Sequence, residues 1–319
     1  MGTTDSIDLS FVIPLYRSED CAERLIQELS SLKDLSYEVI MVNDGSPDGT
    51  REKILAAITK HGGPFTYLEH NRNYGEHNAV MTGYRHTRGR FVVNMDDDLQ
   101  NPVEEAVRLY KHTAANDLDA VYSFYEEKKH HWFRNLGSKF TNRMADCLVD
   151  KPKGFYLSSF RCIRGSIARS ITDYVGPYPY IDGLLFQRTQ RVGRLQVRHD
   201  DRFAGESSYT LTCLIRLWLN MATSFSILPL RLAIMLGLLV SGLSFLGGIM
   251  IVVEYLLYGI ETQGYASLMV AVVFLAGVQL LTLGLMGEYL GRVFLTINGK
   301  PQAVLREDTP QPVRKTAAP

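Results

Sequence analysis

The alternation of apolar and polar positions divides the chain into two parts. In the first part, from Leu9 to about Arg198, short apolar runs alternate with segments of helix length. This alternation is typical of a mainly parallel α/β sheet. We predict strands at residues 11–16, 37–42, 65–69, 91–95 and 120–125, and helices at residues 18–32, 48–60, 76–87 and 103–114.

The second part contains two long apolar runs. Residues 232–253 and 265–287 hold no Asp, Glu, Lys or Arg, and each run is long enough to cross a bilayer, which takes about 20 apolar residues. The apolar-rich segment before them is typical of an interfacial helix. We therefore expect a globular domain at residues 1–210, an interfacial amphipathic helix at 211–230, a two-span hairpin at 231–292 and a partly disordered tail at 293–319, its Pro-rich part beginning at 301.

The basic residues around the apolar runs predict the orientation of the hairpin. The connection between the two runs has no Lys or Arg, whereas Arg231, Arg292 and Lys300 flank the pair. By the positive-inside rule both ends of the hairpin face the cytoplasm. The first ten residues lack the basic and apolar regions of a secretory signal, so we expect the N-terminal domain to be cytoplasmic as well.

Composition and charge exclude several classes of protein. The chain has 319 residues, with 34 basic and 34 acidic side chains, and this balance argues against a nucleic-acid-binding protein that relies on phosphate contacts. A hydrophobic content of 46% argues against a disordered chain. The four cysteines are dispersed without a C-x-x-C pair, so neither a structural zinc site nor a disulfide framework is indicated.

Polar clusters follow three of the predicted strands, at residues 43–46, 71–76 and 96–98. The carboxyl ends of parallel strands meet at one edge of the sheet, where open α/β sheets bind their ligands. We therefore expect these clusters to converge on a binding site.

The most distinctive cluster is the acidic run Asp96–Asp97–Asp98. Crowded carboxylates repel one another unless a cation neutralises them, and Mg²⁺ or Mn²⁺ prefers oxygen ligands that include phosphate. Side chains two apart on an extended strand point the same way, so Asp96 and Asp98, with Gln100, are the candidate metal ligands. An acidic helix N-terminus is the alternative interpretation.

Four segments, in order, carry a resemblance to a known family. They are Phe11–Tyr16, Val42–Asp48, Asn71–Ala79 and the Asp triplet, and they resemble the family 2 inverting glycosyltransferases with the GT-A fold. The resemblance implies that Asp96 and Asp98 hold a metal and the diphosphate of a nucleotide sugar. It implies nucleotide-sugar contacts from Pro14, Tyr16, Glu19, Asp44, Asn73, Gly75 and Asp96. A Rossmann dinucleotide domain is disfavoured, because no G-x-G-x-x-G follows the first strand.

The second half of the chain is similar to the polyprenyl-phosphate glycosyltransferases. The similarity lies in residues 131–143, 202–209 and 286–292, and the family includes dolichyl-phosphate mannose synthases and undecaprenyl-phosphate sugar transferases. It implies an acceptor-phosphate site built from Arg134, Lys139, Arg143, Arg161, Arg202 and Ser207, with Arg202 also catalytic. For Arg134, Lys139 and Arg143, a basic face lying on anionic lipid headgroups is the alternative.

Three departures from the family pattern affect the assignment. Asp97 occupies the middle of the Asp-x-Asp motif, where the family usually has a small residue, so we expect it to point away from the metal. The family commonly has an Asp just before the Phe-Arg step, but this chain has Ser159 before Phe160, which leaves the catalytic base unassigned. Ser208 replaces a usual Lys, so Arg202 carries more of the positive charge.

The sequence therefore predicts a membrane enzyme that moves one sugar, expected from a UDP-sugar, to undecaprenyl phosphate at the cytoplasmic face of a bacterial inner membrane. A processive polysaccharide synthase is one alternative, although the chain has no Q-x-x-R-W element. A membrane scaffold without activity is another, and the intact Asp96 and Asp98 argue against it. The sequence leaves open which sugar is moved and whether the protein forms a homo-oligomer.

Overall fold

The structure is a computed structural model. It describes residues 7–125, 155, 157–176, 178–198, 228–258 and 264–307. The chain forms two compact units, one of residues 1–210 together with 300–319 and one of residues 211–299. Each unit is considered by itself.

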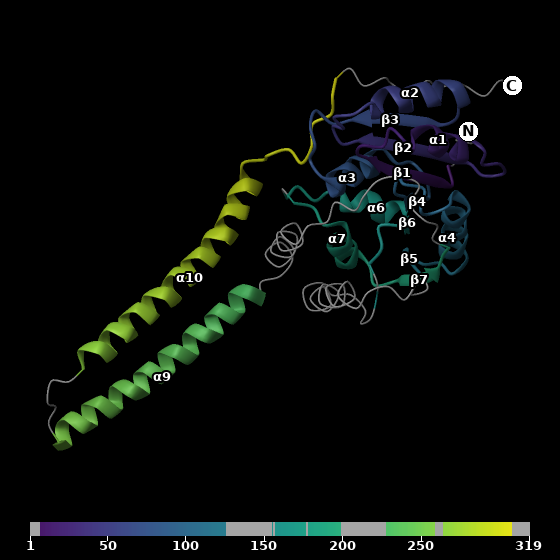
Figure 1. The fold of residues 1–319 in the computed structure, drawn as a ribbon. Coiled ribbons are helices and arrows are strands. Elements are labelled where there is room, and N and C mark those ends of the chain that lie inside the picture. Colours follow the sequence, from purple (N-terminus) through teal and green to yellow (C-terminus); the bar gives the residue numbers. More distant parts are fainter. Residues whose placement is uncertain are drawn as a thin grey trace. The chain divides into compact units, whose positions relative to one another are not determined.

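A seven-stranded mixed sheet forms the centre of the first unit (Figure 1). The strand order is β3-β2-β1-β4-β6-β5-β7, and β6 runs antiparallel to both of its neighbours while the other pairs are parallel. The strands are β1 (Leu9–Leu15), β2 (Tyr37–Asn43), β3 (Phe65–Glu69), β4 (Phe91–Asn94), β5 (Ala120–Phe124), β6 (Arg161–Arg164) and β7 (Val192–Gln196). The five predicted strands are all present.

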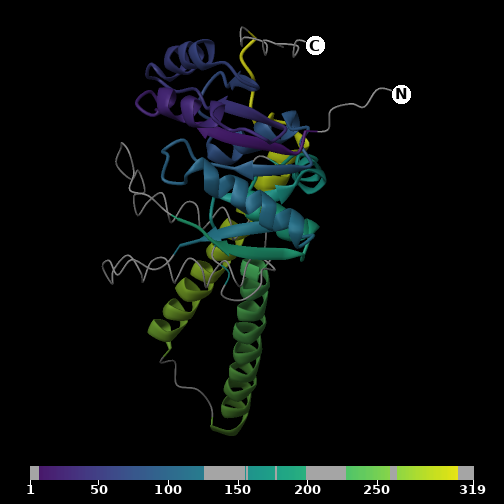
Figure 2. The same cartoon turned by 90° about the vertical axis from the view of Figure 1, so that its right-hand side faces the viewer.

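Helices cover both faces of this sheet, as Figure 2 shows. They are α1 (Ala22–Ser30), α2 (Thr50–His61), α3 (Glu76–His86), α4 (Val103–Ala115), α6 (Gly165–Ile171) and α7 (Ile181–Arg188). Apolar residues of α1, α2 and α4 form the main core with one face of β1, whereas α3 packs on the other face and contacts α6, which contacts α7.

The central strand β1 shows why the two layers form. Its residues Leu9, Phe11, Ile13 and Leu15 are fully buried in the main core, and Val12 faces α3 on the opposite side. A Cβ added at Gly83 of α3 would lie 2.3 Å from Val12 Cγ1, so only glycine allows α3 to approach this closely. A strand buried on both faces has nearly continuous apolar sequence, which is why its position could be predicted.

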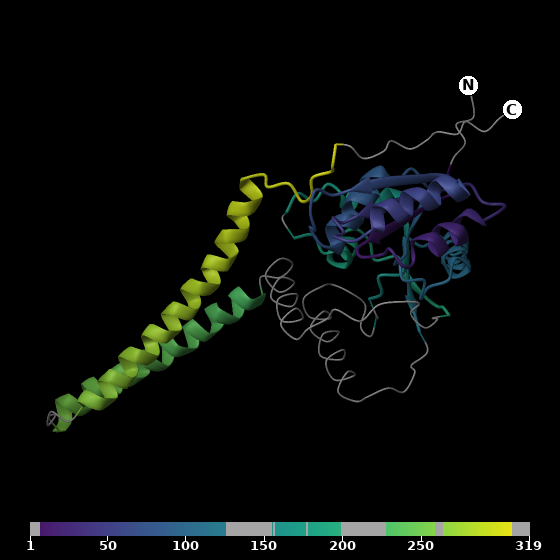
Figure 3. The same cartoon turned by 45° about the horizontal axis from the view of Figure 1, so that its top comes forward.

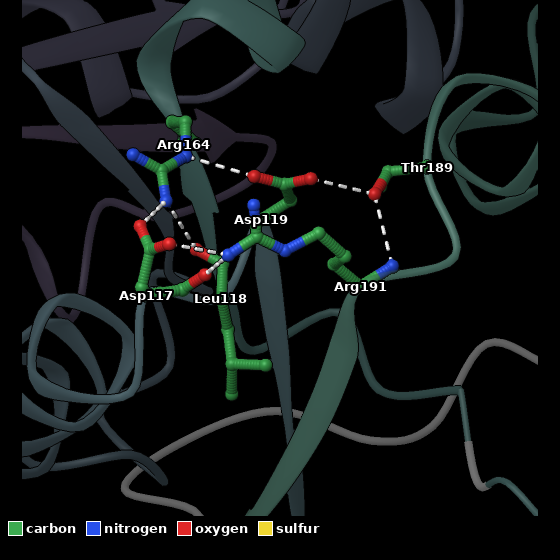
Figure 4. A network of polar contacts seen from close by, with 6 residues as sticks. All are labelled: Asp117, Leu118, Asp119, Arg164, Thr189 and Arg191. Carbon is green, nitrogen blue, oxygen red and sulfur yellow. Dashed lines mark hydrogen bonds and ion pairs between the residues drawn. The ribbon is translucent and has the colours of Figure 1, made fainter.

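The strands that were not predicted, β6 and β7, are tied in by a polar network at the amino edge of the sheet (Figure 4). Asp119 accepts a hydrogen bond from Arg164 Nε at 2.8 Å and another from Thr189 Oγ1 at 2.7 Å. Asp117 pairs with both Arg164 and Arg191. The network connects the start of β5 with the end of β6 and the start of β7, so charged side chains supplement the few apolar residues of these strands.

The second unit contains two long apolar helices, α9 (Leu228–Tyr258) and α10 (Tyr265–Ile297) (Figure 3). They contact each other. Residues 233–251 and 267–297 are apolar enough and long enough to cross a membrane, and most of their described large apolar side chains are exposed. The two predicted spans correspond to these helices. The predicted interfacial helix at 211–230 lies almost wholly outside the described residues.

The end of the chain differs from the prediction. Residues 301–307 were predicted to be disordered because they follow Pro301 in a Pro-rich segment, and this prediction is wrong for them. Gln302 is buried, and Leu305 packs against an apolar cluster of β2, β3 and α3. Residues 308–319 lie outside the described residues.

Candidate active site

The candidate site lies at the carboxyl edge of the sheet, beside β1. Strand order runs from β1 through β2 to β3 on one side and to β4 on the other. The loops after β1 and β4 therefore diverge from a topological switch point, which is where open α/β sheets bind ligands. The predicted convergence of the polar clusters follows from this order.

The acidic run directly follows β4, and serine hydroxyls hold two of its three carboxylates. Ser159 Oγ donates a hydrogen bond to Asp96 Oδ2 at 2.7 Å, and Ser18 Oγ donates one to Asp97. Asp97 is thus directed to the β1–α1 loop, across the switch point. This direction gives Asp97 a partner other than the predicted metal.

The backbone around Asp98 is strained. The next residue, Leu99, is buried and has a φ of 58°, a left-handed conformation that is unfavourable for a leucine. The backbone N–H of Gln100 donates to Asp98 Oδ1 at 3.2 Å. Strain of this kind, held by the surrounding fold, is typical of functional loops.

Burial dominates the electrostatics of the acidic run. It raises the pKa of Asp96 to about 6, with further contributions from the charges of Glu76 and Asp98. Burial also raises the pKa of Asp97 to about 6, and the neighbouring carboxylates Asp96 and Asp98 add to the shift. The charged form of these groups is therefore less favourable than that of an exposed carboxylate, and a cation would compensate the difference.

These carboxylates fit a divalent cation that shares its coordination with a substrate. Among the described residues, no group of three or more His, Cys, Asp or Glu side chains is arranged to hold an ion by itself. Mg²⁺ commonly takes one or two carboxylates and completes its shell with phosphate oxygens and water. The crowded, half-buried charge of the acidic run matches such a shared site, and Asp96, Asp98 and Gln100 remain its predicted ligands.

The loop after β1 contains three of the predicted nucleotide contacts. Pro14 is half-buried at the end of β1, and Tyr16 is 45% exposed. Glu19 Oε2 accepts a hydrogen bond from the backbone N–H of Gly49 at 3.0 Å, directly before α2. Glu19 therefore fastens the β1–α1 loop to the start of α2, whereas the Tyr16 ring is available to a ligand.

Asp44, which stays a predicted nucleotide contact, has partners within the chain. It is buried, and its oxygens accept hydrogen bonds from the backbone N–H groups of Tyr74 at 2.9 Å and Gly75 at 2.7 Å. His70 Nδ1 lies 2.7 Å from Asp44 Oδ1. Asp44 thus holds the loop that carries Asn73 and Gly75, and that role is visible only in three dimensions.

Glycine is required where this loop meets the loop after β2. Gly45 has a φ of 62°, and a Cβ there would lie 2.5 Å from the carbonyl carbon of Arg72. Gly75 has a φ of 95° and immediately precedes α3. The exposed Asn73 follows Arg72, which contacts Gly45, and precedes Gly75 by two residues. The backbone conformation at the two glycines therefore determines where the Asn73 side chain can reach.

Arg161 is the one predicted acceptor residue among the described residues, and it already has a partner. Its side chain is buried and forms an ion pair with Asp182 of α7, while Tyr122 OH donates to the same carboxylate at 2.7 Å. Burying a charge is favourable only when it is paired, and this pair fixes β6 beside Asn94 of β4. The acceptor role of Arg161 stays a prediction, and its charge is already paired with Asp182.

The remaining acceptor residues cannot be placed. Arg134, Lys139, Arg143, Arg202 and Ser207 all lie outside the described residues. Sequence reasoning did not identify Ser18, which the structure brings to the acidic run, or the hydrogen bond of Ser159 to Asp96. It also did not identify Asp182 as the partner of Arg161. A single serine or aspartate forms no sequence motif that would mark it as a site residue. Ser159 is the exception, because it stands where the family commonly has an Asp.

The sequence is similar to those of known glycosyltransferases. The sequence profile described as Glycosyl transferase family 2 matches residues 10–172. The undecaprenyl-phosphate 4-deoxy-4-formamido-L-arabinose transferase of Aeromonas hydrophila is 33% identical over 316 residues, which are 96% of this chain and 95% of the relative. The protein of that name from Proteus mirabilis is 30% identical and covers 96% of each chain.

Solved structures share the fold of the first unit. Glucosyl-3-phosphoglycerate synthase from Mycobacterium tuberculosis, in complex with Mn²⁺, UDP-glucose and phosphoglyceric acid, has a TM-score of 0.51 at 18% identity, covering 68% of this chain and 78% of its own. Its complex with UDP has a TM-score of 0.50 at 17% identity, covering 69% and 79%. The likeness confirms the predicted GT-A fold.

Proposed function

The chain belongs to glycosyl transferase family 2, and from this we propose that it transfers a single sugar from a nucleotide-diphosphate donor to undecaprenyl phosphate. The observation that carries the proposal is the similarity to undecaprenyl-phosphate transferases along 96% of the chain, since it includes both the acidic run and the two apolar helices. Similarity of the first unit alone would support the transferase chemistry but not the lipid acceptor.

The donor would bind across the switch point between β1 and β4. Pro14 and Tyr16 would contact the base, and Asn73 and Gly75 would contact the nucleoside from the loop that Asp44 holds. Glu19 would act indirectly, through its hydrogen bond to Gly49. A UDP-sugar is the donor we expect.

Asp96 and Asp98, with Gln100, would hold Mg²⁺ or Mn²⁺ beside the donor diphosphate. The bound ion would stabilise the negative charge that develops on the departing nucleoside diphosphate. Asp97, hydrogen-bonded to Ser18, would keep the β1–α1 loop in place, and Ser159 would orient Asp96. A cation bound by these carboxylates would make their charged forms more favourable. Their raised pKa values therefore fit a metal site.

The acceptor explains why Ser159 can stand where the family has an acid. In the proposed step an acceptor phosphate oxygen attacks the anomeric carbon and the bond to the donor diphosphate breaks, so the configuration inverts. A phosphate monoester has a second pKa near 6 and is already largely dianionic at neutral pH, so no side chain needs to remove a proton. Positive charge is needed instead, and Arg134, Lys139, Arg143 and Arg202 with Ser207 are the proposed source.

The two apolar helices would anchor the enzyme in a bacterial inner membrane. Arg231 lies near the start of α9 and Arg292 near the end of α10, and by the positive-inside rule we expect both ends and the first unit in the cytoplasm. A reporter fused after Pro319 should then be cytoplasmic, and one inserted near Thr262 should be external. The opposite result would place the donor site on the wrong side for cytoplasmic nucleotide sugars.

The experiment that tests this function is a product analysis. Purified protein is incubated with undecaprenyl phosphate, Mn²⁺ and a panel of nucleotide sugars, and the lipid fraction is analysed by mass spectrometry. We expect one added monosaccharide from one donor. A polymer would favour the processive synthase, and no lipid product from any donor, with donor hydrolysis also absent, would favour the inactive scaffold.

A further inference from the structure

The segment that follows the last apolar helix is built into the first unit. We call residues 301–307 the strap. Gln302 is 8% exposed, accepts a hydrogen bond from Arg85 of α3 at 2.7 Å, and donates to the backbone carbonyls of Tyr174 at 2.7 Å and Gly176 at 2.8 Å. A buried glutamine with three hydrogen bonds is an anchor, because the loss of a bond leaves a largely buried polar group without that partner.

Beyond this anchor the strap pairs with the chain just after β3. The backbone N–H of Asn71 donates to Val304 O at 3.0 Å, and the backbone N–H of Arg306 donates to Glu69 O at 2.8 Å. Between these bonds, Leu305 forms an antiparallel bridge with His70. The strap thus covers the edge of the sheet at β3, in the manner of an added strand.

Apolar and ionic contacts reinforce the pairing. Leu305 packs against the cluster of Ile40, Val42, Leu68 and Ala79. The Arg306 guanidinium lies 3.3 Å from Glu69, which also pairs with Arg51 of α2. The strap therefore contacts β2, β3 and α3 together, and these elements border the loop that holds the predicted nucleoside contacts.

The paired residues lead directly into that loop. His70 lies between the strap on its backbone side and Asp44 on its ring side, where Nδ1 is 2.7 Å from the carboxylate. Its backbone N–H donates to Asn43 O at 2.9 Å. Asn71 is only two residues before Asn73, so the strap and Asp44 restrain the two ends of one short loop.

We propose that the strap is a positioning element of the donor site, which sets the conformation of residues 71–75. The inference rests on the proposed function only in taking that loop to contact the donor. Because only residues 298–300 separate the strap from α10, the same polypeptide that forms the second apolar helix also completes the donor loop. The strap residues touch no substrate and act through His70 and Asn71.

The first test measures the loop without any substrate. Three chains are compared by amide hydrogen exchange in detergent: the full chain, a chain that ends at Lys300 and lacks the strap, and a chain that ends at Glu307 and keeps it. We expect exchange in peptides covering residues 70–79 to rise at least about tenfold in the chain ending at Lys300, because the amides near the strap become locally unprotected. The chain ending at Glu307 should match the full chain. Unchanged exchange in the first variant would overturn the proposal.

The second test separates positioning from general stability. Gln302→Ala in the full chain removes the anchor but leaves the backbone pairing groups, and Glu307→Ala, an exposed change in the same segment, is its matched control. We expect Gln302→Ala to raise the donor KM about tenfold, while the KM for undecaprenyl phosphate changes less than twofold. Equal changes in both KM values would show a merely structural role and overturn the proposal.

The two tests fail in different ways. Faster exchange in the loop with an unchanged donor KM would contradict the assignment of residues 71–75 to the donor, and with it this part of the proposed function. Unchanged exchange would contradict the strap alone. If the chain ending at Lys300 does not fold, the exchange measurement is made on Gln302→Ala, for which we expect a smaller rise over the same peptides.

Discussion

The two edges of the central sheet treat their carboxylates in opposite ways. At the amino edge, Asp117 and Asp119 pair with the guanidinium groups of Arg164 and Arg191 (Figure 4). Hydrogen bonds from Arg191 and Arg164 lower the pKa of Asp117. The protein itself neutralises these charges, so the amino edge needs no ligand to be stable.

At the carboxyl edge the described partners of Asp96 and Asp97 are the hydroxyls of Ser159 and Ser18. A hydroxyl satisfies one hydrogen bond but brings no positive charge, and burial raises the pKa of both carboxyls to about 6. Arg161 lowers the pKa of Asp96 only in part against burial and the neighbouring acids. The difference teaches that an acidic cluster whose pKa values stay raised in the fold indicates a ligand site. A cluster paired with arginines, such as that of Asp117 and Asp119, indicates structure.

The largest expected effect is the loss of sugar transfer when a carboxylate of the carboxyl edge is removed. Asp98→Asn should lower the rate of sugar transfer about 10³-fold or more, or about 4 kcal/mol in transition-state stabilisation, because the metal would lose a charged ligand. Chelator should abolish transfer by the unchanged protein, and added Mn²⁺ should restore it. Transfer at the full rate in either case, measured by radiolabelled donor, would disprove the metal assignment.

A smaller effect is expected from the acceptor side. Arg202→Ala should reduce kcat/KM for undecaprenyl phosphate about 10- to 100-fold, because one charge-assisted contact to the phosphate is removed. Donor binding and membrane attachment should be retained. A loss below about threefold, or about 0.7 kcal/mol, would mean that Arg202 does not hold the acceptor phosphate.

At the amino edge the expected effect is on stability rather than activity. Asp119→Ala removes hydrogen bonds to Arg164 and Thr189 and should lower the free energy of unfolding by about 2 kcal/mol. That loss corresponds to a decrease in Tm of roughly 4–8 °C for a domain of this size. The kcat/KM of the folded enzyme should not change, and a specific loss of activity would show that the two edges are not functionally distinct.

The smallest expected effect is a gain in stability at the carboxyl edge. The folded pKa of Asp97 is about 6, above its ordinary 3.8, so the unfolded chain ionises first as the pH rises. Stability should therefore fall between about pH 4 and pH 6 and remain lower above pH 6. Asp97→Asn should raise the unfolding free energy by about 1 kcal/mol at pH 7.5 in chelator. This is less than the roughly 3 kcal/mol that the full shift corresponds to, because the side chain is only half-buried and solvent screens its charge.

The pH series provides the control for this last prediction. Below about pH 4 the Asp97 carboxyl is protonated in both the folded and the unfolded chain. Asp97→Asn and the unchanged protein should then have the same Tm, except for any small effect of replacing the carboxyl with an amide. Thermal unfolding at several pH values measures the difference. A variant less stable than the unchanged protein at pH 7.5 would mean that the Ser18 hydrogen bond outweighs the burial of charge.

Sequence patterns predicted the first half of the fold because its strands are continuous apolar runs. β1 to β5 begin and end within about two residues of the predicted positions. β6, whose sequence is Arg-Cys-Ile-Arg, and β7, which contains glycine and exposed positions, have too few apolar residues for periodicity to detect. Their places in the sheet are supported by contacts such as the hydrogen bond between Arg164 and Asp119, which lie 45 positions apart in sequence.

The site was predicted by motif, but its internal contacts were not. The acidic run and the polar loops are contiguous in sequence and follow strands, so their place at one edge follows from strand order. The contacts of Asp97 with Ser18 and of Asp44 with the loop at Gly75 join distant segments, and no local pattern encodes them. The strap was missed for the same reason, since Gln302 and Leu305 are ordinary residues of a Pro-rich tail until the sheet edge is present.

The most direct test of the account is a calorimetric titration of UDP into the full-length protein in detergent, with and without Mn²⁺, comparing Asp98→Asn with Asp119→Asn. We predict that UDP binds only when Mn²⁺ is present, that Asp98→Asn weakens binding at least about 100-fold, and that Asp119→Asn leaves it unchanged. Equal affinity with and without Mn²⁺, or equal losses in the two variants, would contradict the claim that the carboxyl edge is the donor site, where Asp98 and the donor diphosphate share a metal.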